Sequence, residues 1–201
     1  EGIGQNKPSS IKGDVWLTCI ECGKAYPPFD FVIYRCQKCG GLLEVRYENL
    51  PTFEDFSGSG VWRYRASLPF EMGVSIKEGN TPLYTVPRIE SDVGVEALRI
   101  KHEGMNPTGS FKDRGMTVGV RVVQELGVKR LACASTGNTS ASLAAYGSRA
   151  GLEVIVLLPA GKVAMGKVAQ ASLHGAKILQ LDGNFDECLD IVTKLADEGE
   201  V

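Results

Sequence analysis

Two cysteine pairs near the start of the chain limit its fold most strongly. Each pair has the form Cys-x-x-Cys, with Cys19 and Cys22 in the first pair and Cys36 and Cys39 in the second. This spacing is typical of a zinc site with four cysteine ligands, although the 13 residues between the pairs are slightly fewer than usual. Glycines follow both pairs, so each can form a tight turn. We therefore expect a zinc ribbon over residues 1–49. Its strands are expected at 14–18, 31–35 and 42–47.

Other uses of these cysteines have to be weighed against zinc. A redox-active Cys-x-x-Cys pair would not explain two matched copies, and disulfide bonds are disfavoured in a cytoplasmic protein. Four thiolates would fill the coordination shell of the metal and leave no open position for chemistry, so we expect a structural role. The remaining cysteines, Cys133 and Cys188, lie in apolar segments and are predicted to be buried, unreactive thiols.

Length and charge narrow the classes of partner. The chain has 201 residues, 43% of them hydrophobic, which is enough for one sizeable domain and a small module. Its formal net charge of −2 provides no basic surface for a nucleic acid or an anionic membrane. The first residues are polar, and no segment approaches the roughly 18 apolar residues of a membrane span. We therefore expect a cytoplasmic protein that binds small molecules or other proteins, with no nucleic-acid or membrane partner.

Beyond residue 50 the pattern changes to that of an α/β fold. Residues 49–69 are predicted to form a connector with one short helix, and a strand is expected at 96–103. Strands and helices then alternate. The predicted strands are 130–135, 153–159 and 176–181. The predicted helices are 138–150, 162–174 and 184–198. This order is typical of a parallel α/β sheet, in which ligands bind at the carboxyl ends of the strands.

One lysine lies where a turn becomes a helix. Ser110 and Asp113 fit a capping box, and an apolar helical pattern follows until Gly127. Lys112 is therefore expected in the first helical turn, where the unpaired amides and Arg114 disfavour the ammonium form. An amine in this position is suited to act as a nucleophile toward a carbonyl. A solvated lysine whose cost Asp113 offsets is the alternative, and the local sequence does not separate the two.

A second turn leads from a predicted strand into a predicted helix. Ser135, Thr136, Gly137, Asn138 and Thr139 can present backbone amides and hydroxyls at the helix start, where a phosphate or carboxylate is stabilised. The segment is neither a GxGxxG motif nor a P-loop. An ordinary strand-to-helix turn with a cap would have the same composition.

These motifs together resemble a known family. EGNTPL at 78–83, NPTGSFKDRG at 106–115 and STGNTSAS at 135–142 are similar, in order and spacing, to the motifs of pyridoxal-phosphate enzymes of fold type II. With the four-cysteine ribbon, GVWRYRASLP at 60–69, and the later segments PAGKVAMGKVAQ and DGNFDEC, the chain is most similar to the threonine synthase family. The resemblance covers nearly the whole chain.

The resemblance implies a role for each motif residue. The lysine matching Lys112 forms the Schiff base with pyridoxal 5′-phosphate, and the asparagine matching Asn138 bonds the pyridine 3-oxygen. The neighbouring loop receives the substrate carboxylate. Its matching residues are Ser135, Thr136, Gly137 and Thr139.

The implied reaction converts O-phospho-L-homoserine and water to L-threonine and phosphate. The cofactor serves as an electron sink, and the lysine amine moves protons as general base and acid. A cysteate synthase or a serine or threonine dehydratase shares the lysine and asparagine motifs, and a zinc-ribbon binding module is an alternative from another class. The family also suggests a homodimer.

The resemblance also implies that part of the enzyme is missing from this chain. The family's glycine-rich loop for the cofactor phosphate and its group that grips the substrate phosphate have no match within residues 1–201. We therefore expect residues 50–201 to be an incomplete catalytic region. Alone, the chain is expected to be inactive and to bind the cofactor weakly.

Overall fold

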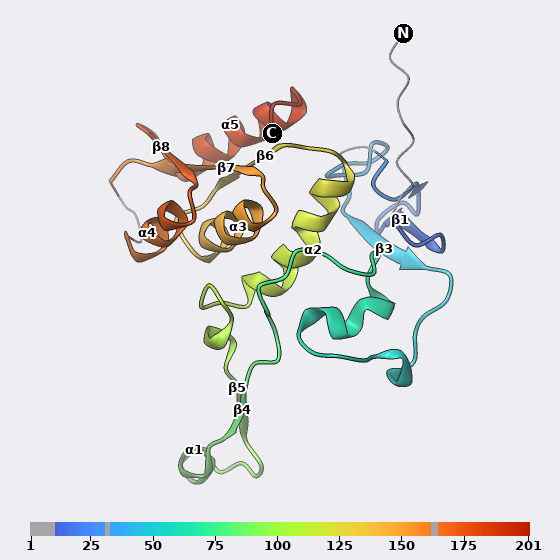
Figure 1. The fold of residues 1–201 in the computed structure, drawn as a ribbon, viewed down its shortest axis with the longest axis vertical. Helices are drawn as coiled ribbons and strands as arrows, with labels where there is room; N and C mark the ends of the chain where they lie inside the picture. Colours follow the sequence, from blue (N-terminus) through green and yellow to red (C-terminus); the bar gives the residue numbers. More distant parts are fainter. Residues whose placement is uncertain (1–10, 31–32, 162–164) are drawn as a thin grey trace.

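The computed structural model describes residues 11–30, 33–161 and 165–201 (Figure 1). Three parts follow one another along the chain: a small antiparallel sheet, an extended connector with a hairpin arm, and a parallel α/β layer. The long helix α2 (Lys112–Glu125) lies between the small sheet and the α/β layer (Figure 1).

The small sheet, which we call the ribbon together with its turns, has three antiparallel strands in the order β2-β1-β3. Their bounds are β1 (Val15–Cys19), β2 (Ala25–Tyr26) and β3 (Leu43–Tyr47). Alternate residues of β1 point inward, since side chains on a strand alternate between the two faces. The buried core of the ribbon is small and includes two of the motif cysteines. It consists of Leu17, Cys19, Tyr26 and Cys36.

The predicted strand at 31–35 is wrong where it can be compared. Its first two residues lie outside the described residues. Ile33 has no regular secondary structure, and Tyr34 and Arg35 form a bend rather than a strand. The apolar composition of this segment fits a pleated surface, but β1 already pairs with a neighbour along each edge. Ile33 instead packs its side chain against the ribbon core.

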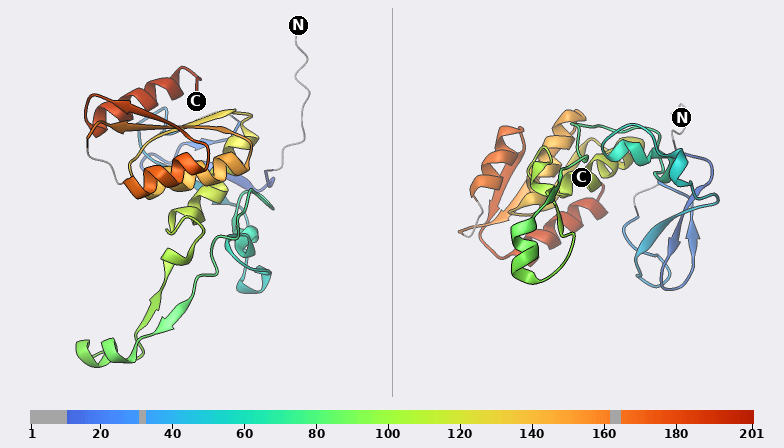
Figure 2. Two further views of the ribbon diagram at one scale, coloured as in Figure 1. Left: turned by 60° about the vertical axis from the view of Figure 1, so that its left-hand side comes forward. Right: turned by 90° about the horizontal axis from the view of Figure 1, so that it is seen from below.

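The connector contains more structure than the single predicted helix. Two 3-10 helices, η1 (Phe53–Asp55) and η2 (Val61–Ser67), are followed by an arm that projects from the body of the molecule (Figures 1 and 2). The arm consists of an antiparallel pair of strands with a short helix at its tip, and a third 3-10 helix follows it. These elements are β4 (Leu83–Thr85), α1 (Pro87–Val93), β5 (Arg99–Lys101) and η3 (Glu103–Met105).

Helix α2 buries one stripe of its surface. Asp113, Thr117 and Val120 are its buried residues, and their spacing of four and three places them on one face. Trp62 from η2 donates a 2.9 Å hydrogen bond from Nε1 to Thr117 Oγ1, which anchors the connector to this helix. The helix ends as predicted before Gly127, whose φ of +72° is easily adopted only by glycine.

The α/β layer has the predicted parallel sheet, in the order β6-β7-β8. The strands are β6 (Arg130–Ala134), β7 (Glu153–Pro159) and β8 (Lys177–Leu181). The helices are α3 (Asn138–Arg149), α4 (Met165–Leu173) and α5 (Phe185–Asp197). Helices α3 and α4 cover one face, and α5 covers the other (Figure 2). Alternation along β7 explains both cores, because Val154, Val156 and Leu158 pack in one cluster and Leu157 packs with Cys188 in another.

Within the described ranges, no helix has the length and hydrophobicity needed to cross a bilayer.

Candidate functional sites

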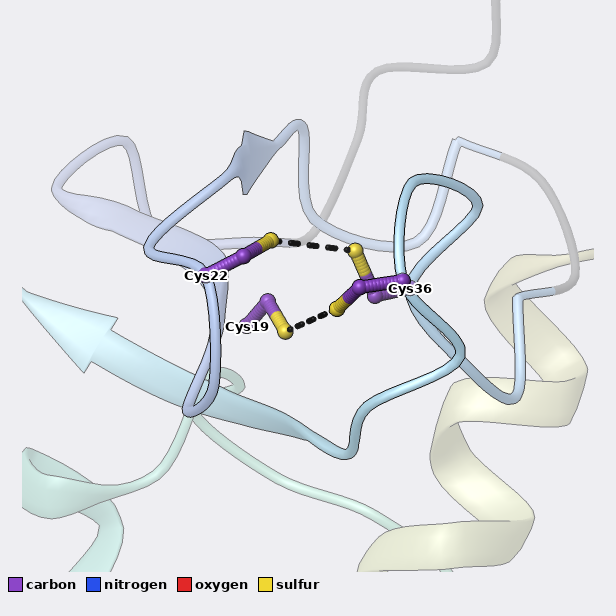
Figure 3. Close-up of side chains that lie close together, drawn as sticks. Cys19, Cys22 and Cys36 are labelled. Carbon is purple, nitrogen blue, oxygen red and sulfur yellow. Dashed lines mark hydrogen bonds between the residues drawn. The ribbon is translucent and has the colours of Figure 1, made fainter.

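The four motif cysteines come together at one end of the ribbon. All four Sγ atoms lie within 4.8 Å of one another. The closest pairs are Cys19 with Cys39 at 3.5 Å and Cys22 with Cys36 at 3.6 Å. Figure 3 shows that Cys19, Cys22 and Cys36 point toward a common centre. A tetrahedral metal site with Zn–S bonds of about 2.3 Å has its sulfurs about 3.8 Å apart, so the cluster has the dimensions of such a site.

Backbone hydrogen bonds shape the two turns in the same way. Gly23 N–H donates to the carbonyl of Cys19 at 3.0 Å, and Gly40 N–H donates to the carbonyl of Cys36 at 2.8 Å. Both glycines have positive φ angles, +71° and +75°, which explains why glycine follows each pair. A third glycine, Gly41, leaves space for the cluster, because a Cβ there would lie 2.9 Å from Cys19 Sγ.

The electrostatics of the cluster favour a bound cation. A hydrogen bond between the Tyr26 hydroxyl and Cys36 Sγ, 3.1 Å long, lowers the pKa of the Cys36 thiol to about 6. A hydrogen bond with Gly41 lowers the pKa of Cys39, but the thiols of Cys22 and Cys19 outweigh it and raise this pKa to about 12. Only part of the cluster would therefore ionise near neutral pH without a cation. A divalent ion would balance half of the charge of four thiolates and would favour the thiolate form of each of its ligands, so the donor set fits a metal.

Lys112 is the first residue of α2, as predicted. Its side chain is exposed, and Nζ lies 5.2 Å from the centre of the Phe111 ring. Among the described residues, Nζ makes no hydrogen bond or ion pair. The amine therefore stands at the positive end of a helix with its bonding capacity unused.

The predicted capping box at Ser110 and Asp113 is wrong, because Phe111 is the N-cap of α2 and no side chain caps this helix. Ser110 Oγ does accept a 3.1 Å hydrogen bond from the Lys112 backbone N–H. The Asp113 carboxylate, however, accepts hydrogen bonds from Thr108, at 2.7 Å from the backbone N–H and at 2.5 Å from the hydroxyl. Asp113 is completely buried, and a buried carboxylate needs several donors, which Thr108 supplies.

Asp113 also joins α2 to α3. Its Oδ1 accepts a 2.6 Å hydrogen bond from the hydroxyl of Ser142, which is buried one helical turn after Asn138. Residues four apart lie on the same face of a helix, so Asn138 shares the face of α3 that meets the start of α2. The structure thus brings the Lys112 and Asn138 segments to one edge of the α/β layer.

The loop that carries Lys112 is held by residues that the sequence analysis did not single out. Asn106 is buried. Its side-chain oxygen Oδ1 accepts a 2.9 Å hydrogen bond from Gly79 N–H, and its Nδ2 donates a 2.8 Å hydrogen bond to the Glu103 carbonyl. From α4, Lys167 Nζ donates a 2.8 Å hydrogen bond to the Thr108 carbonyl. In the sequence, Lys167 is marked only by its place in the segment PAGKVAMGKVAQ, and this segment alone does not indicate a partner for it.

Arg114 does not act on Lys112 as the uncompensated like charge that the sequence suggested. Its guanidinium binds the Glu103 carboxylate through two hydrogen bonds, at 2.7 Å and 2.8 Å, and a third reaches Thr81 Oγ1 at 3.0 Å. The hydrogen bond from Arg114 lowers the pKa of Glu103 to about 2. Glu103 is therefore ionised at neutral pH and balances the charge of Arg114.

The first motif, EGNTPL, contacts α3 through its glutamate. Glu78 is 1% exposed, and its Oε2 accepts hydrogen bonds from Ile76 N–H at 3.0 Å and from the Tyr146 hydroxyl at 2.9 Å. Burial raises the pKa of Tyr146, so this hydroxyl remains a donor. All three sequence motifs therefore meet in one hydrogen-bonded network around the start of α2.

The loop after β6 has the predicted strand-to-helix form. Gly137 is the N-cap residue of α3. Its backbone N–H donates a 3.3 Å hydrogen bond to Ser135 Oγ, and its carbonyl accepts a 2.8 Å hydrogen bond from Ser140 Oγ. Thr136 and Thr139 are half-buried, and Asn138 is exposed. The Asn138 side chain makes no hydrogen bond within the described part of the chain. Free amides at the start of α3 and an unengaged amide side chain make this loop able to bind an anionic ligand.

Comparison with known proteins gives a consistent result. The family described as pyridoxal-phosphate dependent enzyme matches residues 74–201. The chain is 54% identical over 191 residues to a threonine synthase of Methanosarcina acetivorans, covering 92% of this chain and 47% of the relative. It is 54% identical over 190 residues to a threonine synthase of Methanocaldococcus jannaschii, covering 90% and 46%. The chain spans about half the length of these curated relatives.

A solved structure supports the same fold. Maize serine racemase superposes with a TM-score of 0.54 at 24% sequence identity, over 60% of this chain and 36% of the racemase. This likeness concerns the fold alone, and it agrees with the predicted fold type II architecture with a parallel sheet. Because the family match covers well over half of the chain, the chain belongs to the pyridoxal-phosphate dependent enzyme family.

Proposed function

We propose that this chain is the N-terminal portion of a threonine synthase, which converts O-phospho-L-homoserine and water to L-threonine and phosphate. The observation that carries the proposal is the 54% identity with the Methanosarcina acetivorans enzyme. That match covers 92% of the chain and leaves only about 16 of 201 residues unmatched, so the matched stretch spans the segments that carry the cysteine cluster and the three motifs.

Two side chains are proposed to hold the cofactor. Lys112 would bind its aldehyde carbon covalently through Nζ, and Asn138 would donate a hydrogen bond to the 3-oxygen of its ring. The Lys112 amine and the Asn138 side-chain amide make no hydrogen bond with any other described residue. The hydrogen bond between Asp113 and Ser142 holds together the two helices that carry them, α2 and α3. Bound pyridoxal phosphate would supply an electron sink for negative charge on the carbons of the substrate.

The loop after β6 is proposed to bind the carboxylate of the amino acid. Backbone amides at a helix start and hydroxyl groups stabilise an anion, and the loop offers both. The residues proposed for this role are Ser135, Thr136, Gly137 and Thr139.

Lys112 is also proposed to move protons. Its amine could accept a proton from a substrate carbon and return it to another, because it makes no hydrogen bond or ion pair with any other described residue. Asp113 would keep Lys112 in place, since its buried hydrogen bonds fix the first turn of α2 to the Thr108 loop and to α3.

The cysteine cluster is proposed to bind one structural zinc ion. Cys19, Cys22, Cys36 and Cys39 supply four thiolates, which leave no position for a substrate or for water. On this basis residues 1–49 form a zinc ribbon and residues 50–201 form part of the catalytic region, and we propose a homodimer in the cytoplasm.

The proposal is tested by comparing substrates in a protein that contains the whole family domain. O-phosphohomoserine should give equal amounts of threonine and phosphate. Release of sulfonate product from phosphoserine and sulfite would identify a cysteate synthase instead, and 2-oxobutanoate from free threonine would identify a dehydratase. Absence of threonine and phosphate from O-phosphohomoserine would contradict the proposal.

A further inference from the structure

A small polar pocket lies behind the first turn of α2. Its volume is about 290 Å³, and it is formed by η2, the turn before β4, the end of β5 and the start of α2. Its polar lining residues are Arg63, Tyr64, Asn80, Lys101, Glu103 and Arg114. None of these residues belongs to the proposed cofactor or substrate site.

Positive charge is in excess in this pocket. Three of its side chains are cations, and Glu103 is the single carboxylate. The two-pronged ion pair between Arg114 and Glu103 neutralises one cation. Arg63 and Lys101 form no ion pair with any residue that the structure describes. Two uncompensated cations therefore face one concave space, which concentrates their field.

The donors of these cations are directed by the surrounding structure. Lys101 Nζ donates a 2.6 Å hydrogen bond to the Thr81 carbonyl, so its position is fixed while further N–H groups remain available. Arg63 is exposed and can offer the paired N–H groups that match two oxygens of a carboxylate or phosphate. Tyr64, whose hydroxyl is a neutral donor, also lines the pocket.

The wall of the pocket is backbone that cannot easily move. Gly60 has a φ of +67°, and a Cβ at this position would lie only 2.6 Å from the Glu78 carbonyl oxygen. Asn80 has a φ of +51°, a conformation that asparagine tolerates better than most residues. The intervening Gly79 is held by its hydrogen bond to Asn106. The pocket is thus largely preformed.

The pocket and Lys112 lie on different sides of α2. Arg114 follows Lys112 by two residues, which is about 200° around an α-helix. A ligand in the pocket would therefore contact the same helical turn as Lys112 without entering the proposed active site.

We propose that this pocket binds a small oxyanion, the phosphate or carboxylate group of a metabolite, between Arg63 and Lys101. The volume is at the lower limit for ligand pockets, so the ligand has few atoms beyond its anionic group. Binding adds an anion next to the Arg114 and Glu103 pair and so links ligand binding to the helix that carries Lys112.

The experiment is a titration of the ¹⁵N-labelled chain with inorganic phosphate, at constant ionic strength maintained with chloride. Saturable shifts are expected in the amide signals of residues 60–64, 80 and 101. Arg63→Gln should weaken phosphate binding about 10-fold, because one charged donor pair is lost. Arg63→Lys should have a smaller effect, since it keeps the charge but not the paired donors.

Arg88→Gln is the matched control. Arg88 is exposed on α1 at the tip of the arm, so its loss removes the same charge at a distance (Figure 1). Phosphate binding should be unchanged in this variant. Equal weakening by Arg63→Gln and Arg88→Gln would show general charge attraction and overturn the proposal.

Two further arms identify the anion and separate this site from the proposed active site. Malonate in place of phosphate tests a carboxylate ligand, and tighter binding of either one identifies the preferred group. Amide shifts confined to residues 135–139 would place the anion in the proposed substrate loop. This result would overturn the proposed anion site in the pocket and leave the proposed function unaffected. The absence of a saturable shift with both phosphate and malonate would also overturn the proposed anion site.

Discussion

The ribbon and the α/β layer reach a folded state by different means. The four buried core residues of the ribbon include two cysteines of the metal cluster, and its sheet has only short strands. The main core of the α/β layer contains seven buried apolar residues and no cysteine of the cluster. They are Leu143, Ala144, Val154, Val156, Leu158, Ala171 and Ala176.

This difference separates a metal-dependent region from one that depends on apolar burial. A module as small as the ribbon buries little surface, so a bound metal has to contribute much of its stability. The parallel sheet is covered on both faces by helices, and its stability comes from packing. The proposed catalytic residues belong to α2, α3 and the loops before them, and none lies in the ribbon.

The largest effect is expected from removing the metal. Chelation should unfold the ribbon, because apparent binding energies of structural zinc are about 10 to 16 kcal/mol at neutral pH. Amide hydrogen exchange should become fast in β1 and β3 and stay slow in β6 and β7. Simultaneous loss of protection in both regions would contradict the claim that only the ribbon depends on the metal.

A matched cysteine variant sharpens this test. Cys19→Ser should release zinc, whereas Cys133→Ala should retain one equivalent, because Cys133 lies on β6 away from the cluster. Zinc content by elemental analysis distinguishes them. Less than about half an equivalent in the carefully purified, reduced parent chain would contradict a structural zinc site.

The next largest effect concerns the buried carboxylate that joins α2 to α3. Asp113→Ala should lower the free energy of unfolding of the α/β layer by about 3 to 5 kcal/mol, because it leaves buried donors on Thr108 and Ser142 without a partner. Ser142→Ala removes one donor only and should cost about 1 kcal/mol. Urea denaturation measures both values. Equal costs for the two variants would show that the carboxylate is not the centre of the network.

A smaller effect should depend on pH. The pKa of Glu103 is lowered to about 2 by its hydrogen bond from Arg114, so the stabilisation is complete above the ordinary value near 4.5 and is lost as pH falls through 2. At pH 7, Glu103→Gln should lower the free energy of unfolding by about 1 to 3 kcal/mol. The difference from the parent protein should shrink between pH 4.5 and pH 2. A difference that stays constant over this range would contradict the assigned ion pair.

The smallest effect is expected at the start of α5. Asn184 Oδ1 accepts hydrogen bonds from the backbone amides of Asp186 and Glu187, and Glu187 bonds back to Asn184 N–H. Asn184→Ala should therefore cost about 1 kcal/mol. Zinc content and ribbon exchange should not change, because α5 packs on β6 and β7. Thermal unfolding of the variant and its parent provides the measurement.

Features with a local cause could be predicted from the sequence. The turns after each cysteine pair, the end of α2 near Gly127 and the alternation of strands and helices from residue 130 depend on residues close together in the chain. The meeting of the four cysteines followed from their spacing. These predictions are confirmed because local preference and tertiary packing agree.

Features set by distant partners could not be predicted. Asp113 was expected to cap its own helix, but Thr108 and Ser142 take its carboxylate once α2 packs on α3. Ile33 was expected in a strand, but neither edge of β1 was free to pair with it. The roles of Glu78 and Lys167 depend on partners 68 and 59 residues away, Tyr146 and Thr108, and no pattern within a short segment indicates them.

The most direct test of the proposed function compares Lys112→Ala with the parent in a protein that contains the whole family domain. Phosphate release from O-phosphohomoserine should fall by at least about 10³-fold, because Lys112 supplies both the nucleophile and the proton-transfer group. Zinc content and urea unfolding should match the parent, since Lys112 is exposed. A Lys112→Ala protein that releases phosphate at the parent rate without added amine would contradict the assignment.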